Sequence, residues 1–281
     1  MTAAVGELVE DRYRIEAVIG RGAMGTVYRA RHVGMGREVA IKVLHDHLVR
    51  DPVMVKRFDR EAAIAARLSH RNVVGVIDIG ATAHGDRMMV LELARGETLA
   101  AIAARGPMAG ERVVPLVVQL LRGLEHAHAL GLVHRDLKPE NVIVERADVV
   151  RIVDFGMAVL RDASGDPAGM RVTEMGMLLG TPAYMAPEQA LGEAPDPRTD
   201  LFALGVIVYE LLAGCLPYSG SALEIVLANV HQDPPPIAHR APGVRVDPRL
   251  ESFARRLMAR PLAERFASAR AALDFLNHFM K

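Results

Sequence analysis

The sequence predicts an α+β protein with two lobes, a small strand-rich N-terminal part and a larger, mainly helical C-terminal part. Three observations favour this class. Runs with loosely alternating apolar residues dominate the chain up to about Leu93, and apolar residues at three- and four-residue spacing dominate it after Gly96. Hydrophobic residues make up 51% of the 281 residues, which is enough apolar surface to bury a sizeable core.

The N-terminal lobe, residues 1–94, is expected to contain an antiparallel sheet and one main helix. Strand-like runs lie at 12–20, 25–31, 38–44, 73–79 and 88–93. The helix is expected over 52–68, because Asp51 is a suitable N-cap and proline is favoured at the first helical position. One face of this helix is formed by Met54, Phe58, Glu61, Ala65 and Leu68.

The C-terminal lobe, residues 95–281, is expected to be built from helices. Their apolar periodicity places them at 110–130, 200–213, 223–230, 248–258 and 268–280. Two short strands are expected at 141–144 and 149–153, and the proline-rich piece 233–242 is expected to be a loop. Gly214 is well placed as a C-terminal cap.

Charge and composition exclude several classes of protein. The 34 basic and 34 acidic residues give no net charge, which argues against a nucleic-acid binder and against membrane contact by this segment. No apolar run is long enough for a signal peptide or a membrane span. Cys215 is the only cysteine, which favours a cytoplasmic location, and its apolar surroundings predict a core position. A membrane anchor elsewhere in a longer protein stays an open alternative.

A glycine-rich turn, Gly20-Arg21-Gly22-Ala23-Met24-Gly25, joins the first two expected strands. Glycines without a Cβ atom let backbone N–H groups approach phosphate oxygens closely. Because a strand and not a helix follows the turn, the pattern disfavours a dinucleotide-binding βαβ unit. Glycine turns between strands are common, so the remaining motifs decide what this one means.

Lysine is scarce, since every cation other than Lys42, Lys56, Lys138 and Lys281 is arginine. Lys42 ends an apolar strand run, and Glu61 lies on the apolar face of the helix that follows. An unpaired buried charge is strongly destabilising, so we expect Lys42 to pair with Glu61 and to be held toward a phosphate. The alternative is that Glu61 is an ordinary solvated helix residue.

The densest polar cluster is the run from His134 to Asn141, with the sequence HRDLKPEN. Asp136 could accept a proton from an attacking hydroxyl, and Lys138 could neutralise charge on the group being transferred. Asn141 and Asp154 stand at the ends of successive strand runs and could share a hard cation through oxygen ligands. One such element alone can be a capped turn, but all of them in this order indicate a catalytic site.

Together these motifs resemble those of the protein kinase superfamily over almost the whole chain, from about Tyr13 to Phe279. The resemblance implies the bilobal protein-kinase fold for residues 1–281 as a single domain, with an activation segment at 154–188. Its landmarks are the glycine turn, Lys42, Glu61, His134 to Asn141, Asp154-Phe155-Gly156, Ala186-Pro187-Glu188, Asp200 and Arg265.

The resemblance also implies a role for each landmark, with ATP and Mg²⁺ (or Mn²⁺) as cofactors. Lys42 would bind the ATP phosphates with support from Glu61, and Asn141 and Asp154 would hold the metal. Asp136 would be the catalytic base. Glu188 would pair with Arg265, and Asp200 would brace the catalytic loop from beneath.

A nucleotide pocket follows from the same resemblance. Leu91 would occupy the gatekeeper position, and Glu92 and Ala94 would offer backbone groups at the hinge. The whole set of nucleotide-binding residues would be Ile19, Gly20, Gly22, Gly25, Val27, Ala40, Lys42, Leu91, Glu92, Ala94 and Ile143. The apolar members of this set would also suit a core that binds nothing.

The run from Gly180 to Glu188, together with Lys138, is similar to serine/threonine kinases and not to tyrosine kinases. Thr181 would then bridge Asp136 and Lys138 at the substrate hydroxyl. The short lobes and the run up to Gln189 are similar to bacterial eukaryotic-like (Hanks-type) kinases. The expected partners are therefore proteins with serine or threonine acceptors, and an N-lobe homodimer is plausible by the same resemblance.

One departure, one expected regulatory site and two alternatives complete the sequence-based interpretation. Phe202 stands where this family often carries tryptophan, and we expect little consequence. Arg135 beside Asp136 is typical of control by a phosphorylated activation segment, so we expect autophosphorylation at Thr173, unless Thr173 is only a solvated loop residue. A pseudokinase scaffold would lack one of the landmark residues, and a small-molecule phosphotransferase would lack the run that ends at Glu188. Neither alternative fits this chain.

Overall fold

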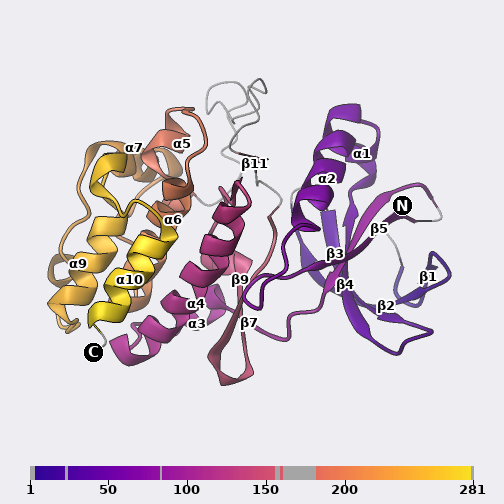
Figure 1. Ribbon diagram of the computed structural model, residues 1–281, viewed down its shortest axis with the longest axis horizontal. Helices are drawn as coiled ribbons and strands as arrows, with labels where there is room; N and C mark the ends of the chain where they lie inside the picture. The colour runs from indigo at the N-terminus through magenta and orange to yellow at the C-terminus, as the bar shows by residue number, and fades with distance from the viewer. Residues whose placement is uncertain (1–3, 23–24, 83, 156–158, 161–181, 280–281) are drawn as a thin grey trace. The chain divides into compact units, whose positions relative to one another are not determined.

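The computed structural model of the chain describes residues 4–22, 25–82, 84–155, 159–160 and 182–279. The chain divides into two units, Met1–Ala94 and Arg95–Lys281 (Figure 1). The first unit is an antiparallel sheet with helices, and the second is mainly helical, so the expected α+β class is confirmed.

The N-terminal unit contains an antiparallel sheet with the strand order β1-β2-β3-β4-β6-β5. Its strands are β1 (Leu8–Val9), β2 (Tyr13–Arg21), β3 (Gly25–His32), β4 (Glu38–Leu44), β5 (Val76–Ala81) and β6 (Arg87–Glu92). Helices α1 (Asp46–Val49) and α2 (Pro52–Ala65) follow β4. The expected strand at 73–79 therefore begins three residues later than predicted, and α1 was not predicted.

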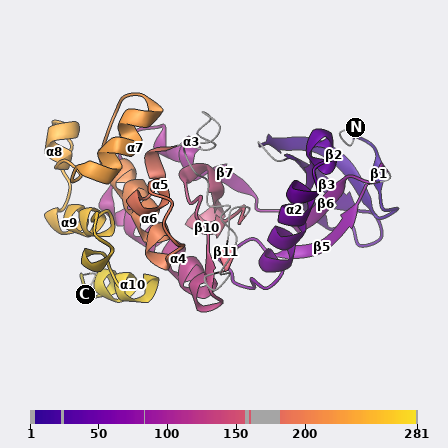
Figure 2. The same ribbon diagram turned by 90° about the horizontal axis from the view of Figure 1, so that it is seen from above.

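Both faces of this sheet bury apolar side chains. One face carries the cluster Val9, Tyr13, Ile15, Tyr28, Ala30, Val39, Ile41, Val43, Met88 and Val90. The other face packs against α2, where Phe58 and Ala62 meet Leu44 and Met89, and Figure 2 shows α2 lying against the sheet. The side chain of Asp51 accepts from the N–H of Val53 at 2.8 Å, which confirms the predicted cap.

The C-terminal unit begins with short elements and continues as a set of helices. Its strands are β7 (Gly96–Thr98), β8 (Leu132–Val133), β9 (Val142–Glu145), β10 (Val149–Ile152) and β11 (Val159–Leu160). Its α-helices are α3 (Leu99–Ala103), α4 (Gly110–Ala129), α5 (Pro187–Ala190), α6 (Pro197–Ala213), α7 (Ala222–His231), α8 (Ile237–Arg240), α9 (Pro248–Leu257) and α10 (Ala269–Phe279). Strands β10, β9 and β7 form one antiparallel sheet, and β11 pairs with β8.

Helix α6 is central to this unit because it contacts both α4 and α9 (Figure 1). Its residues are buried almost all round, which explains why its apolar residues do not form a single stripe. The helix begins at Pro197, three residues before the predicted start, and the side chain of Asp196 caps its N-terminus. Gly214 ends it with φ +71°, a left-handed conformation that glycine adopts without strain, as predicted.

Three predictions for the C-terminal unit are wrong. The proline-rich piece 233–242 contains α8 and is not wholly a loop. Helix α3, which Thr98 caps through its side chain, was not predicted. Cys215 is partly exposed and not in the core. Within the described ranges, no helix has both the length and the apolar character that a membrane crossing requires.

Candidate active site

The loop between β8 and β9 brings together three of the predicted site residues. The ammonium of Lys138 donates to Oδ2 of Asp136 at 2.7 Å. The amide nitrogen of Asn141 donates to the carbonyl oxygen of Asp136 at 2.8 Å and to its Oδ2 at 3.2 Å. The carboxylate of Asp136 is thus fixed in orientation by a cation and an amide, while its side chain stays 33% exposed.

The same loop is anchored from α6 by Asp200. Its Oδ2 accepts from the backbone N–H of His134 at 2.9 Å, and its Oδ1 accepts from that of Arg135 at 2.9 Å. The ring nitrogen Nε2 of His128, near the end of α4, donates to Oδ2 at 2.8 Å. Asp200 is only 1% exposed, so these three donors replace the water that its carboxylate would otherwise bind.

These contacts also set the charge state of Asp200. Burial alone would raise the pKa of its carboxyl group, because water no longer solvates the charged form. The hydrogen bond from His128, with the contribution of His134, outweighs that effect and lowers the pKa of Asp200 below its usual value. Asp200 therefore remains a carboxylate that can accept from the loop.

His134 joins this loop to the strand that precedes Asp154. Its Nδ1 accepts from the N–H of Asp136 at 3.3 Å, and its Nε2 donates to the carbonyl of Val153 at 3.2 Å. Its ring lies 4.5 Å from that of Phe155, centroid to centroid. The histidine is fully buried and thus ties the backbone of Asp136 to the residues on either side of Asp154.

Asn141 and Asp154 come from neighbouring strand ends, as predicted. Strands β9 and β10 pair antiparallel, with Val142 opposite Ile152, and the N–H of Val153 donates to the carbonyl of Asn141 at 2.9 Å. The hydrogen bonds of the Asn141 side chain use its amide nitrogen, so its oxygen remains the atom suited to a cation. An amide oxygen and an exposed carboxylate, from residues at the ends of paired strands, form a donor set that fits a hard divalent cation such as Mg²⁺.

Five of the predicted nucleotide-binding residues of the N-terminal unit share one face of its sheet. Strand pairing places Gly20 opposite Val27, Val27 opposite Lys42, and Ala40 opposite Leu91. Directly opposed residues point to the same face, so these side chains and the Gly20 position lie on the face that α2 covers. Lys42 is only 7% exposed there.

The other predicted pocket residues differ in their exposure and contacts. Ile19 is 49% exposed on β2, and Ala94 closes the N-terminal unit and is partly buried. The carboxylate of Glu92 lies 3.6 Å from the guanidinium of Arg37, which leaves only its backbone for a hinge contact. Ile143 belongs to β9 in the other unit and is partly buried.

Glycines 20, 22 and 25 of the turn differ in what surrounds them. A Cβ atom on Gly25 would lie 2.3 Å from the carbonyl oxygen of Val43, so no side chain fits there. A Cβ atom on Gly20 would meet nothing closer than 3.8 Å. The N–H of Gly22 closes the turn by donating to the carbonyl of Gly25 at 2.9 Å.

Several predictions lie outside the described residues. Thr181, Thr173 and Gly156 fall in the undescribed ranges. Glu61 is in α2, but its side chain is not described, so its pairing with Lys42 stays a prediction.

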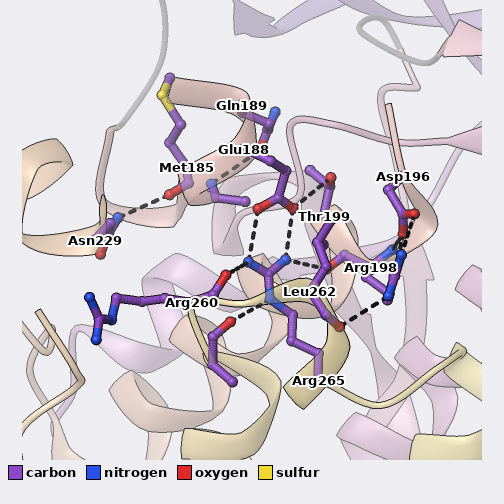
Figure 3. Close-up of polar contacts among 12 residues, drawn as sticks. Met185, Glu188, Gln189, Asp196, Arg198, Thr199, Asn229, Arg260, Leu262 and Arg265 are labelled. Carbon is purple, nitrogen blue, oxygen red and sulfur yellow. Dashed lines mark hydrogen bonds and ion pairs between the residues drawn. The ribbon is translucent and has the colours of Figure 1, made fainter. Parts of the chain in front are cut away.

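The predicted pair of Glu188 and Arg265 is present and buried (Figure 3). Two guanidinium nitrogens donate to the two carboxylate oxygens at 2.7 and 2.8 Å, and the hydroxyl of Thr199 donates to one of them at 2.9 Å. Arg265 also donates to the carbonyls of Arg198, Ala259 and Arg260. This bidentate pair fastens α5 to the start of α6 and to the segment before α10.

The turn at Pro182–Tyr184, which precedes α5, is held from both sides. The amide of Asn229 on α7 donates to the carbonyls of Ala183 and Met185 at 3.2 and 3.0 Å. The hydroxyl of Tyr184 donates to the carboxylate of Glu210 at 2.7 Å. Burial raises the pKa of Tyr184, and burial together with Glu140 raises the pKa of Glu210, although the tyrosine hydrogen bond opposes the rise at Glu210.

Sequence reasoning missed four residues that organise this region: His128, Gln189, Glu210 and Asn229. Gln189 was noted only as the end of a motif run, although its place at the third position of a short helix is a capping signal. Nothing in the local pattern distinguishes Glu210 or Asn229 from ordinary polar helix residues, because their partners lie in a distant turn.

The comparisons with known proteins agree with this geometry. A family model described as "Protein kinase domain" matches residues 13–278. Serine/threonine-protein kinase pkn3 of Myxococcus xanthus is 42% identical over 273 residues, which are 95% of this chain and 50% of that protein. Serine/threonine-protein kinase PknA of Mycobacterium tuberculosis is 37% identical over 243 residues, or 84% and 55% of the two chains.

The chain thus spans about half the length of these curated relatives. Among solved structures, the kinase domain of Mycobacterium tuberculosis PknI is similar with a TM-score of 0.74 and 28% identity over 99% of both chains. The match of the family model to nearly the whole chain shows that this chain belongs to the protein kinase domain family.

Proposed function

We propose that the chain is a single kinase domain, residues 1–281, that transfers the γ-phosphate of ATP to serine or threonine hydroxyls of proteins. The observation that carries the proposal is the contact of Asp136 with both Lys138 and Asn141, on a loop that Asp200 anchors. The serine/threonine class is supported by the names of the bacterial relatives.

Asp136 is proposed to accept the proton of the acceptor hydroxyl, with its carboxylate oriented by Asn141. Lys138, 2.7 Å from that carboxylate, would balance negative charge that develops on the transferred group. Thr181 is proposed to bridge these two side chains at the substrate hydroxyl. Positioning and charge neutralisation supply most of the catalysis in phosphoryl transfer, so a rigid loop is what this reaction needs.

Asn141 and Asp154 are the residues proposed to hold the metal. Mg²⁺ or Mn²⁺ bound there would neutralise charge on the phosphates. Lys42 is proposed to bind the α- and β-phosphates, supported by Glu61, and the apolar residues Val27, Ala40, Leu91 and Ile143 to contact adenine. The shared sheet face of the first three supports this assignment.

Transfer of radiolabelled γ-phosphate to a generic basic protein tests the proposal. Asp136→Asn is expected to reduce transfer by about 10²- to 10⁴-fold, since it removes the proton acceptor. Asp274→Asn, which changes an exposed carboxylate on α10, is the matched control and should transfer phosphate like the wild type. Equal rates for wild type and Asp136→Asn would contradict the proposed function.

Autophosphorylation within residues 154–188 is part of the proposal, with Thr173 as the site and Arg135 as the anchor of its phosphate. The position of Arg135 beside Asp136 supports it. Phosphosite mapping of wild-type protein and of the Asp136→Asn variant checks it. An active wild-type protein with unmodified Thr173 would contradict this part alone.

An N-lobe homodimer is the partner proposal that the surface supports. Met35, at the turn between β3 and β4, is 72% exposed, and Ile77 and Ile79 are also exposed on the edge strand β5. Light scattering of wild type and of Met35→Lys tests it, and a wild-type monomer at all concentrations would exclude it. A cytoplasmic location is proposed for the domain because its co-substrate is ATP.

A further inference from the structure

Gln189 contacts both the catalytic loop and the segment that precedes α5. Its Nε2 donates to the carbonyl oxygen of Arg135 at 2.8 Å. Its Oε1 accepts from the backbone N–H of Ala186 at 3.2 Å, the residue at the N-cap of α5. One side chain therefore bridges two backbone segments that are more than fifty residues apart in the sequence.

The bridged carbonyl belongs to the peptide group between Arg135 and Asp136. The other end of that peptide group, the N–H of Asp136, donates to Nδ1 of His134 at 3.3 Å. Gln189 and His134 therefore hold the two ends of one rigid plane. The rotation of this plane sets the direction in which the Asp136 side chain leaves the backbone.

The plane needs this support because of its backbone conformation. Arg135 has φ +67°, a left-handed conformation that a residue with a branched or long side chain seldom adopts and that strains the backbone. Asp200 fixes the N–H of Arg135, and Gln189 fixes its carbonyl. Without the second contact, the carbonyl would lose the Gln189 donor, and one of the constraints on the peptide plane would be removed.

We propose that Gln189 is a positioning residue, which couples the segment 182–190 to the catalytic loop by fixing the Arg135–Asp136 peptide plane and thereby the carboxylate of Asp136. The proposal rests on the proposed function, because it assigns Gln189 to the same site. It makes the orientation of the catalytic carboxylate depend on a residue that does not touch the substrate.

Gln189→Glu tests the proposal with a minimal change. The variant keeps an oxygen to accept from Ala186 but replaces the donor that faces the carbonyl of Arg135. Two facing acceptors favour the protonated form of the introduced carboxyl, which can still donate, and so raise its pKa above the usual value of about 4.3. The charged and titratable groups on the bridged elements are those of His134, Arg135, Asp136, Lys138 and Glu188. Asp200 binds the N–H of Arg135, Lys138 binds Asp136, and Arg265 binds Glu188.

Gln119→Glu is the matched control. Gln119 on α4 makes the same pair of contacts elsewhere, since its Nε2 donates to the carbonyl of Asp148 at 2.8 Å and its Oε1 accepts from the N–H of Val150 at 3.1 Å. The substitution places the same repulsion at the turn between β9 and β10. Gln189→Met, which removes both hydrogen bonds without adding charge, is the second test variant.

The measurement is kcat and the KM for ATP between about pH 6 and about pH 8.5, with thermal unfolding of every variant. Gln189→Met is expected to lower kcat by about tenfold or more at every pH, and Gln189→Glu to do so once its carboxyl ionises. The KM for ATP should stay unchanged in both, because what is lost is the hydrogen bond to the Arg135 carbonyl beside the reacting atoms. The deficit of Gln189→Glu should deepen as pH rises and the introduced carboxyl ionises. Gln119→Glu should follow the wild-type pH profile.

Wild-type kcat at every pH in either Gln189 variant, or the same pH-dependent deficit in Gln119→Glu, would overturn the proposal. Asp136→Asn, assayed beside them, separates this outcome from failure of the proposed function. If Asp136→Asn loses activity while the Gln189 variants keep theirs, the kinase assignment stands and the positioning role fails.

Discussion

The guanidinium of Arg265 lies 5.0 Å from the centroid of the Phe202 ring while it binds both carboxylate oxygens of Glu188. Phe202 is only 1% exposed, so the ring is part of the environment that a buried arginine needs. The sequence suggested that phenylalanine in place of the family's frequent tryptophan would have little consequence. The structure instead gives this ring a defined partner.

Phe202→Leu is therefore expected to lower the free energy of unfolding by about 2–3 kcal/mol, the sum of a cavity and a lost cation–π contact. Tryptophan has a stronger π face but a larger ring than phenylalanine. Because the site is closely packed, Phe202→Trp should lower the free energy of unfolding by about 1–3 kcal/mol. Urea unfolding of both variants measures these values. A Phe202→Leu protein as stable as the wild type would show that the ring does not support Arg265.

Asp200→Asn tests the anchor of the catalytic loop. At neutral pH the variant is expected to lose about 3–5 kcal/mol of stability, because a buried carboxylate with three donors is replaced by a group that accepts with one atom. The pKa of Asp200 is lowered in the folded protein, despite burial, by His128 and His134. The stability that the Asp200 carboxylate contributes is thus present above the usual pKa of 3.8. It is lost as the pH falls below 3.8 toward the lower pKa that Asp200 has in the folded protein.

Unfolding of wild type and Asp200→Asn should accordingly be compared from about pH 3 to about pH 7. The two proteins are expected to differ most at neutral pH and to converge in acid. A difference that stays constant over this range would contradict a lowered pKa for Asp200. Asp247→Asn provides a control, since this carboxylate also has a lowered pKa but is exposed at the N-cap of α9.

Glu210→Gln should show the opposite dependence on pH. Burial, with Glu140 adding to it, raises the pKa of Glu210 above its usual 4.5, although the hydrogen bond from Tyr184 opposes this. The stability associated with its protonated form is fully present below pH 4.5 and is lost as pH rises through the folded pKa. Glutamine has no charge to lose, so the variant should gain stability relative to wild type as pH rises from acid to neutral.

Chemical unfolding at acidic and at neutral pH measures this gain, and Tyr184→Phe provides the converse case. Removing the hydroxyl leaves the Glu210 carboxylate without the donor at 2.7 Å, so this variant should lose stability mainly at neutral pH. A Glu210→Gln protein whose stability relative to wild type is the same at both pH values would show that Glu210 titrates normally.

Local signals account for the parts of the fold that sequence predicted correctly. Asp51 and Gly214 were assigned as caps because each acts on its own helix end. Helix α8 was missed because its support comes from distant residues. The carboxylate of Glu251 accepts from the N–H of Ile237, and the hydroxyl of Tyr209 donates to the carbonyl of Pro235 just before the helix.

In the candidate site, too, residues close together in the sequence were predicted and residues that act through distant contacts were not. Lys138, Asn141 and Asp136 lie within six residues, so the sequence could assign them to one site, although it did not predict the hydrogen bonds among them. Gln189 was not assigned a role, because its partner is a backbone carbonyl of a segment that only the folded chain brings near. A backbone partner leaves no sequence motif, since any residue supplies the same carbonyl.

Substitutions of Gly25 and Gly20 test which glycine of the turn after β2 is required for the fold and which for nucleotide binding. Gly25→Ala would bring a Cβ atom within 2.3 Å of the Val43 carbonyl oxygen, and this backbone atom cannot move without disturbing the pairing of β3 with β4. The variant is expected to lose about 1–3 kcal/mol of stability. Thermal unfolding of the domain measures this loss.

Gly20→Ala is the matched substitution, because its Cβ atom would find only an ordinary contact with Val27 at 3.8 Å. Its stability should stay within about 0.5 kcal/mol of wild type. If the turn binds phosphate through its backbone, the added methyl group should raise the KM for ATP by about tenfold, the equivalent of one hydrogen bond to a charged group. An unchanged KM for ATP in a stable Gly20→Ala protein would show that Gly20 has no part in nucleotide binding. A Gly20→Ala protein that is clearly less stable than wild type would show that the turn packs more tightly than its contacts indicate.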